Sequence, residues 1–312
     1  MDNVAKKAEK LAGKLVVAVS SRALFDLERE HRLFEEEGVA AYRKFQIEHA
    51  EDPLRPGVAF PFISRLLGLN AVFPEECPVK VVVLSRNSPE TGQRFFNSCR
   101  YYKLPISAGA FTSGQSTFPF MKAFNASLFL SANRESVLLA NREGLPAGLI
   151  LPNDFKNDNE DAGLRIAFDF DGVIADDEAE RKFQAEGLDA FQQQETDKRM
   201  QPLKAGPLQM LFSKLSAIQA LDTLKGKKDP YYKPALRIAI VTSRGAPSEQ
   251  RLITTLKSFG MSAAELFLLD GLSKKGVLDV LKPHIFFDDQ LRHLTTSSVP
   301  CVLIPFGVNS GN

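Results

Sequence analysis

The chain has 312 residues and a formal net charge of +1, with 44% hydrophobic and 25% charged residues. These values are typical of a soluble globular protein of about two domains. The near-neutral charge excludes a global field that would attract nucleic acid or an acidic membrane. No apolar run approaches the roughly 18 residues of a membrane span, and the N-terminal residues lack a signal-peptide pattern. We therefore expect a cytoplasmic protein without a nucleic-acid or membrane partner.

The apolar runs predict two successive sets of the same elements. The predicted strands of the first half are residues 15–19, 79–84, 127–131 and 147–151, with a helix at 90–102. After an Asn-, Asp- and Gly-rich linker, those of the second half are 164–169, 236–242, 284–288 and 300–304, with a helix at 247–259. In each half, an acidic helical segment and a long insertion follow the first strand. Continuous apolar strands that alternate with helices indicate an α/β fold with a doubly wound parallel sheet in each half.

The two halves also resemble each other in sequence. "LFEEEGVAAY" (33 to 42) aligns with "KFQAEGLDAF" (182 to 191), and "PLRPG" aligns with "PLKAG" at the same offset. "VVVLSRNSPETGQR" aligns with "IAIVTSRGAPSEQR", which places Arg86 on Arg244 and, after one inserted residue, Arg94 on Arg251. Ordered matches of this kind indicate two copies of one unit. We predict domains at 1–155 and 156–312, with a cap insertion at about 176–230 in the second.

Candidate chemical groups occur only in the second copy, where its predicted strands end. They are Asp169 and Asp171; Thr242 followed by Ser243 and Arg244; Lys275; and Asp288 with Asp289. Ligands of open α/β sheets bind beyond the carboxyl ends of the strands. At the aligned positions the first copy has Val19, Ser21, Leu84, Phe118, Ser131 and Ala132. We therefore expect chemistry in the second copy and a scaffold role for the first.

The paired acids predict a cation site. Asp169 and Asp171 precede Gly172 at a strand end, and carboxylates this close repel each other unless they share a cation or a proton. Together with Asp288 they offer oxygen ligands that suit Mg²⁺, whereas the unpaired histidines and scattered cysteines do not indicate zinc. Thr242 and Lys275 would hold the oxygens of a phosphate. The alternative, a solvated turn before a helix, does not account for the other strand-end groups.

The motifs resemble those of a known phosphatase superfamily. "FDFDGV", "VTSR", "SKKG" and "FFDD" occur in the order of the four motifs of the haloacid dehalogenase superfamily. "SRNSPETG", "LFLSAN", "FDFDGVIADDEAE", "PLKAGPL" and "PHIFFDDQ" resemble the cytosolic type I 5'-nucleotidase family over nearly the whole chain. The resemblance implies a Mg²⁺-dependent enzyme that hydrolyses nucleoside 5'-monophosphates to nucleoside and phosphate.

The resemblance also implies roles for individual residues. Asp169 would be the nucleophile that forms an aspartyl-phosphate, and Asp171 would be the general acid and base. Asp169, the carbonyl of Asp171, and Asp288 or Asp289 would hold Mg²⁺. Thr242 and Lys275 would complete the phosphate site, and we prefer Lys275 to its neighbour Lys274 because it directly precedes Gly276.

Several alternatives stay open. Arg244 binds the phosphate or forms a structural ion pair. Phe183 and Phe191 stack on a base or, as we favour, pack in the core. The N-terminal copy is expected to pack against the catalytic one, supplying part of the nucleotide pocket or the interface of a homo-oligomer. Two other functions are a phosphatase of sugar phosphates or small metabolites, and a nucleotide-binding signalling module without turnover.

Overall fold

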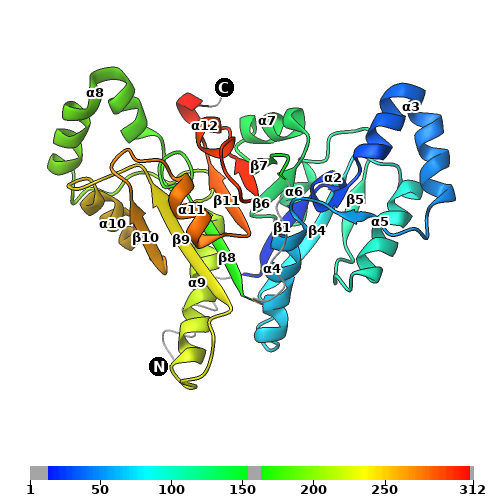
Figure 1. Cartoon of the computed structure of the whole chain (residues 1–312), viewed down its shortest axis with the longest axis horizontal. Helices are drawn as coiled ribbons and strands as arrows, with labels where there is room; N and C mark the ends of the chain where they lie inside the picture. The colour runs from blue at the N-terminus through cyan, green and yellow to red at the C-terminus, as the bar shows by residue number, and fades with distance from the viewer. Residues whose placement is uncertain (1–12, 154–162, 310–312) are drawn as a thin grey trace. The chain divides into compact units, whose positions relative to one another are not determined.

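The computed structural model describes residues 13–153 and 163–309. Two compact units make up the chain: Val16–Pro152, here the N-terminal unit, and a C-terminal unit that contains Leu15 and the chain from Asn153 onward. Each unit combines a central sheet with helices (Figure 1). The predicted boundary between residues 155 and 156 lies outside the described residues. Within the described residues, no helix combines the length and the apolar character that crossing a membrane requires.

The sheet of the N-terminal unit has the strand order β7-β6-β1-β4-β5. Its strands are β1 (Leu15–Val19), β4 (Val79–Ser85), β5 (Gly109–Phe111), β6 (Leu128–Ser131) and β7 (Ala147–Ile150). The short strands β2 (Phe25–Asp26) and β3 (Arg55–Pro56) form a separate antiparallel pair. The helices are α2 (Ser21–Leu24), α3 (Glu28–Glu48), α4 (Phe60–Val72), α5 (Pro89–Tyr101), α6 (Phe120–Ala123) and α7 (Arg134–Arg142). α4 packs on β4, and α7 packs on β6 and β7.

The sheet of the C-terminal unit has the order β10-β9-β8-β11-β12, and all its neighbouring strands are parallel. Its strands are β8 (Leu164–Phe168), β9 (Leu236–Thr242), β10 (Glu265–Leu268), β11 (Ile285–Asp288) and β12 (Cys301–Leu303). The helices are α8 (Glu178–Asp197), α9 (Gln209–Gly226), α10 (Glu249–Ser258), α11 (Lys275–Leu281), α12 (Leu291–Leu294) and the 3-10 turn η1 (Gly307–Asn309). When the strands of each unit are numbered along the chain, the C-terminal sheet has the order 3-2-1-4-5, and the N-terminal sheet has the same order when it is read from β5 to β7. This doubly wound order confirms the predicted α/β class.

Buried aromatic side chains fix β8, which leads into Asp169, and β11, which ends at Asp288. The Phe168 and Phe287 rings stack with centroids 5.0 Å apart, and Phe212 from α9 meets Phe168 edge-on at 5.1 Å. All three side chains are fully buried. This packing holds the ends of β8 and β11 side by side, because the two strands cannot slide without breaking it.

The two units repeat several local arrangements. α3 and α8 are each interrupted by a glycine of positive φ, Gly38 at 81° and Gly187 at 82°, a conformation that favours glycine because it has no Cβ. In α5 and α10, Arg94 and Arg251 each donate from Nε to a backbone carbonyl at 2.9 Å. These features follow one another in the same order in both units, which agrees with the alignment of the two halves.

At the first strand of each sheet, the structural correspondence differs by one residue from the sequence alignment. The backbone N–H groups of Ser20 and Asp169 each donate to the end of the neighbouring strand at 2.8 Å. Ser20, and not Val19, therefore occupies the place of Asp169, and Arg22 occupies that of Asp171. This one-residue shift changes which side chains of the N-terminal unit lie on the same face of the sheet as Asp169, because successive residues of an extended strand point to opposite faces.

At the second strand the alignment needs a similar correction. The backbone N–H of Asn87 donates to Ser85 Oγ, and that of Arg244 donates to Thr242 Oγ1, both at 3.2 Å. Asn87, and not Arg86, therefore corresponds to Arg244, and no residue needs to be inserted before Arg94.

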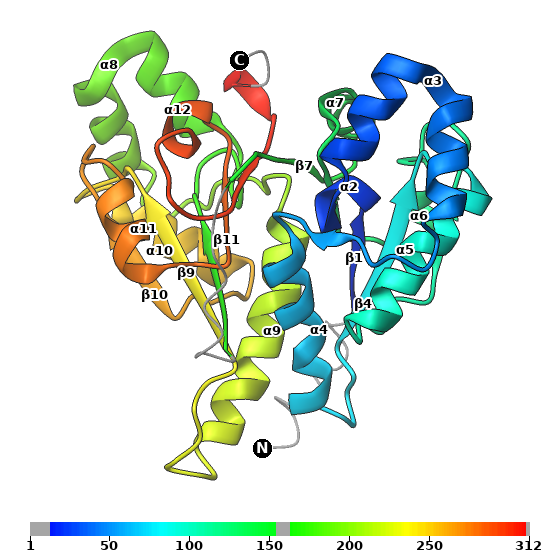
Figure 2. The same ribbon diagram turned by 45° about the vertical axis from the view of Figure 1, so that its right-hand side comes forward.

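The segment predicted as a cap, residues 176–230, divides into two parts. An antiparallel bridge between Ala175 and Ala205 closes the base of the first part, which contains α8. The second part contains α9, which packs along β9 (Figure 2). α9 therefore belongs to the layer that covers the sheet, and the segment outside the layers is shorter than predicted.

Candidate active site

Two acids and a lysine meet at the carboxyl ends of neighbouring strands. Asp169 follows β8 and Asp288 ends β11, on either side of the point where the strand order reverses. Lys274 Nζ lies 2.8 Å from Asp169 Oδ2 and 2.7 Å from Asp288 Oδ2, and all three side chains are buried. In doubly wound sheets this position is where ligands bind.

The cluster holds its two carboxyl groups in different states. Burial raises the pKa of Asp169 to about 7; Lys274 opposes this shift, and the charges of Asp288 and Asp171 add to it. Burial also disfavours ionisation of Asp288, but Lys274 and the hydrogen bond with His293 outweigh it and hold that pKa below the usual range. Asp169 therefore gives up its proton less readily than Asp288, as expected for coupled acids.

The structure does not bring the predicted Lys275 to this site. Its side chain is exposed, and Nζ lies 2.7 Å from Asp279 on the same helix. Lys274, to which the sequence analysis preferred Lys275, precedes the first residue of α11 and points inward. Consecutive residues at a helix start project about 100° apart, so only one of the two lysines can face the acids.

His293 is a site residue that the sequence reasoning missed. Its Nδ1 lies 3.1 Å from Asp288 Oδ2, and ligand atoms of Asp169, Asp288 and His293 lie within 4.8 Å of one another. Two carboxylates and an imidazole at this separation fit a divalent cation. The sequence does place this histidine five residues after Asp288, in the short helix α12. Without the fold, however, the direction of its side chain could not be predicted.

The predicted metal ligand Asp289 lies beneath the turn at Gly172. A Cβ atom on Gly172 would stand 2.4 Å from Asp289 Oδ2, and the φ of Gly172 is 71°. Glycine is therefore required twice, for the backbone conformation and for the close approach of the carboxylate. Asp289 is buried and lies outside the group formed by Asp169, Asp288 and His293.

Arg244 forms an ion pair with both carboxylate oxygens of Asp171. Arg244 Nε lies 2.7 Å from Oδ2 and Nη2 lies 2.8 Å from Oδ1, which is the bidentate geometry of a strong ion pair. Burial opposes the charge on Arg244, but Asp171 and Glu195 outweigh it and raise its pKa. The structural ion pair is thus the arrangement observed for Arg244.

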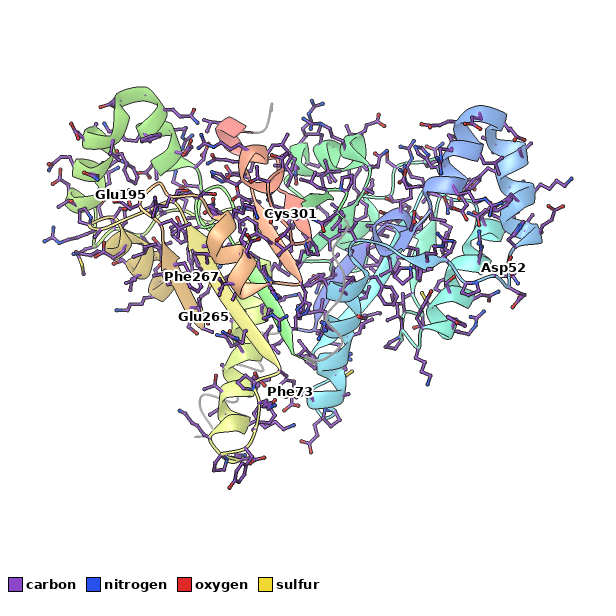
Figure 3. The ribbon with its side chains drawn as sticks, in the orientation of Figure 1. Asp52, Phe73, Glu195, Glu265, Phe267 and Cys301 are labelled. Carbon is purple, nitrogen blue, oxygen red and sulfur yellow. The ribbon has the colours of Figure 1, made fainter. Side chains whose placement is uncertain are left out.

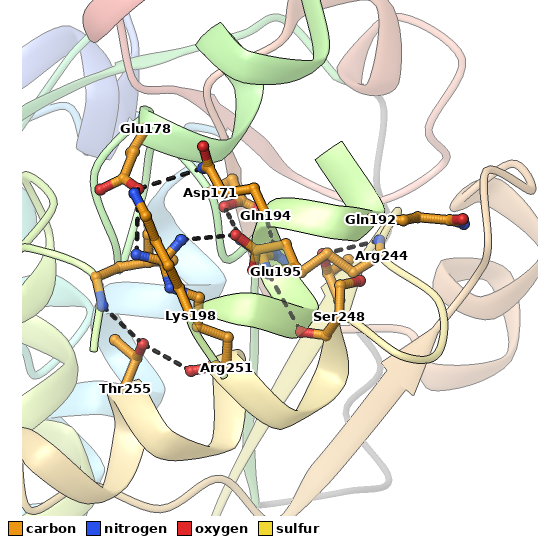
Figure 4. A network of polar contacts seen from close by, with 12 residues as sticks. Asp171, Glu178, Gln192, Gln194, Glu195, Lys198, Arg244, Ser248, Arg251 and Thr255 are labelled. Carbon is orange, nitrogen blue, oxygen red and sulfur yellow. Dashed lines mark hydrogen bonds and ion pairs between the residues drawn. The ribbon is translucent and has the colours of Figure 1, made fainter. Parts of the chain in front are cut away.

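A buried ion network extends from Arg244 into α8 and α10 (Figure 4). Arg244 also pairs with Glu195 of α8, whose side chain has no exposed surface, and Figure 3 locates Glu195 at that helix. Arg251 of α10 lies 2.7 Å from Glu195 and 3.1 Å from Glu178. The network therefore fixes the direction of Asp171 from two helices.

Thr242 and Ser243 continue the edge formed by the strand ends. Thr242 ends β9, the strand beside β8, and its side chain is buried, whereas Ser243 is exposed.

The orientation of the Asp169 carboxylate is set by its own backbone. Asp169 Oδ1 accepts the N–H of Phe170 at 2.7 Å, which turns the other carboxylate oxygen, Oδ2, toward Lys274.

The preferred core role of Phe183 and Phe191 is wrong. Phe183 is 43% exposed, and the two rings meet edge-on with centroids 6.4 Å apart on α8. The Arg244 guanidinium lies 5.6 Å from the Phe191 ring centroid. The aromatic pair therefore stands beside the ion network and outside the core.

Comparison with known proteins identifies the family. The 5'-nucleotidase family profile matches residues 7–311. The chain belongs to the 5'-nucleotidase family. This 5'-nucleotidase family member is 31% identical over 301 residues to human cytosolic 5'-nucleotidase 1B, in an alignment that covers 95% of the chain and 49% of the relative. The chain thus spans about half the length of that curated relative. No solved structure matches this family member.

Proposed function

We propose that the protein is a Mg²⁺-dependent 5'-nucleotidase that hydrolyses nucleoside 5'-monophosphates through an aspartyl-phosphate on Asp169. The observation that carries this proposal is the buried cluster of Asp169, Lys274 and Asp288 beside an Asp171 held by Arg244. Membership of the 5'-nucleotidase family supports it.

In the first step, a carboxylate oxygen of Asp169 attacks phosphorus and the bond from phosphorus to the ribose 5'-oxygen breaks. Asp171 gives its proton to the departing oxygen, so the product is a neutral nucleoside. In the second step Asp171 takes a proton from water, which attacks phosphorus and releases phosphate and the Asp169 carboxylate.

The geometry sets a condition on each acid. Asp169 must lose its proton before attack, although burial raises its pKa to about 7. Asp171 must be protonated at the moment of departure, which requires it to release at least one of its two hydrogen bonds with Arg244.

Asp169 and Asp288 would hold the cation, with His293 beside them and Asp289 and the Asp171 carbonyl as further predicted ligands. The cation would supply neutralisation of the phosphoryl charge. The oxygen-rich donor set favours Mg²⁺. Thr242, Ser243 and Lys274 would contact the phosphate oxygens, with Lys274 in place of Lys275.

We further propose that the two units are copies of one unit of the haloacid dehalogenase type and that residues 176–204 form the cap of the catalytic copy. The repeated glycine kinks and arginine contacts support this. Phe183 on α8 would stack on the base. A cytoplasmic location agrees with the name of the human relative, and a homo-oligomer stays a prediction.

A phosphate-release assay tests the function. Purified protein with Mg²⁺ is given purine and pyrimidine nucleoside monophosphates and, in parallel, simple sugar phosphates. We expect turnover of nucleotides, and its loss in Asp169→Asn. Equal turnover of sugar phosphates would favour the broader phosphatase, and nucleotide binding without phosphate release would favour the signalling module.

A further inference from the structure

The N-terminal unit has a pocket at the strand-end edge that corresponds to the candidate active site. Its volume is about 510 Å³, within the range of roughly 300–1,000 Å³ that small-molecule sites occupy. Ser20 after β1, Ser85 at the end of β4 and Ser131 at the end of β6 line it. All its lining residues belong to this one unit.

The inner end of the pocket presents neutral hydrogen-bonding groups. The hydroxyls of Ser21 and Ser85 are buried and lie 3.0 Å apart. The N-cap residues of α5 and α7, Ser88 and Asn133, also line the pocket. Hydroxyls together with the positive ends of two helix dipoles favour the oxygens of an anion.

Positive charge surrounds these groups, because Arg22, Arg43 and Arg86 line the pocket while no aspartate or glutamate does. Each arginine has an ion-pair partner beyond the lining, as Arg22 does in Glu28 at 2.8 Å. Arg22 Nε is nevertheless buried without a hydrogen-bond partner among the described residues. An unsatisfied buried donor is costly, so Arg22 would gain a hydrogen bond by turning this N–H toward an anion in the pocket.

The outer wall of the pocket is apolar and aromatic. Phe34 and Tyr42 from α3 meet edge-on at 6.0 Å, and Leu27 and Val39 also line this wall. Phe34 is 43% exposed and Val39 is 65% exposed. Large apolar side chains that stay exposed around a pocket indicate a ligand with a flat apolar part.

We propose that this pocket binds a second nucleoside monophosphate and retains it without hydrolysis, with the phosphate at the hydroxyls and Arg22 and the base against Phe34. Ser20 stands where the catalytic unit has Asp169, and Arg22 stands where it has Asp171. The pocket lining therefore offers neither a carboxylate nucleophile nor an acid to protonate a leaving group. The choice of ligand rests on the proposed function, whereas the absence of turnover follows from these residues.

Photoaffinity labelling of the full chain tests the proposal. The Asp169→Asn variant, which blocks turnover, is irradiated with 8-azido-AMP in the presence of Mg²⁺, and the labelled peptides are mapped. We expect label on α3 as well as on α8. Adding Arg22→Ala should raise the AMP concentration that is needed to compete with the α3 label at least tenfold. Arg142→Ala is the matched control, because Arg142 is an exposed arginine of the same unit outside the pocket. It should leave that concentration unchanged.

Phe34→Ala provides a second variant on an exposed side chain, with the exposed Tyr101→Ala as its control. Thermal unfolding confirms that each variant folds. Absence of label from the N-terminal unit, or a label insensitive to both Arg22→Ala and Phe34→Ala, overturns the inference. If the wild type releases phosphate from AMP while α3 stays unlabelled, only this inference fails. If α3 carries an Arg22-dependent label and no phosphate is released, only the proposed function fails.

Discussion

Replacing Lys274 by methionine tests the centre of the candidate site. The substitution keeps most of the side-chain volume and removes the charge that lies between Asp169 and Asp288. Lys275→Met is the matched control, because it removes the same charge one residue later from a side chain that is about half exposed. The two variants have the same composition and net charge.

The contact distances set the expected magnitude. A unit charge pair at about 2.8 Å is worth about 6 kcal/mol at an effective dielectric constant of about 20, and desolvation offsets several kcal/mol of this for each ion. Leaving buried charges without their partner typically costs about 3–5 kcal/mol. We expect Lys274→Met to lower the free energy of unfolding by that amount without metal, and Lys275→Met to change it by less than about 1 kcal/mol.

Urea unfolding measures the stability difference, and phosphate release from a nucleoside monophosphate with Mg²⁺ measures activity. Loss of a preorganised charge at the reacting phosphate should lower kcat about 10²–10³-fold in Lys274→Met. Lys275→Met should stay within about twofold of wild type. The reasoning is refuted if Lys274→Met keeps both stability and kcat, or if the two lysine variants lose them equally.

Three other outcomes are expected. In the absence of metal, the wild type should lose stability relative to Asp169→Asn as the pH rises from about 4 to about 7. Burial raises the pKa of Asp169 from 3.8 to about 7, so over this range the unfolded chain loses the proton more readily than the folded protein does. A stability difference between the two proteins that stays the same at all pH values would contradict this. Glu195→Gln should lower the free energy of unfolding by about 3–5 kcal/mol. It should also reduce kcat more than it changes KM, because Glu195 helps Arg244 to hold Asp171. An unchanged kcat in steady-state assays would remove that positioning role. Mg²⁺ should raise the melting temperature of the wild type in thermal unfolding, and an equal rise in Asp288→Asn would place the cation elsewhere.

The strand periodicity and the acids at strand ends were readable without the fold. Residues 15–19 and 236–242 were predicted as strands with the bounds that the structure has, because continuous apolar runs in an α/β chain bury both faces. The edge strands β5 and β10 were missed. β10 alternates between half-buried and exposed residues, since an edge strand need not be uniformly buried.

Short-range sequence patterns established the α/β class, the similarity of the two halves and the presence of Asp169 and Asp288 at strand ends. Tertiary structure alone decided which of two adjacent lysines faces the acids, that Arg244 holds Asp171, and that His293 joins the group. The physical reason is that a one-residue change in helix phase or strand register turns a side chain to a different face. Only the packing of elements distant in sequence sets that phase.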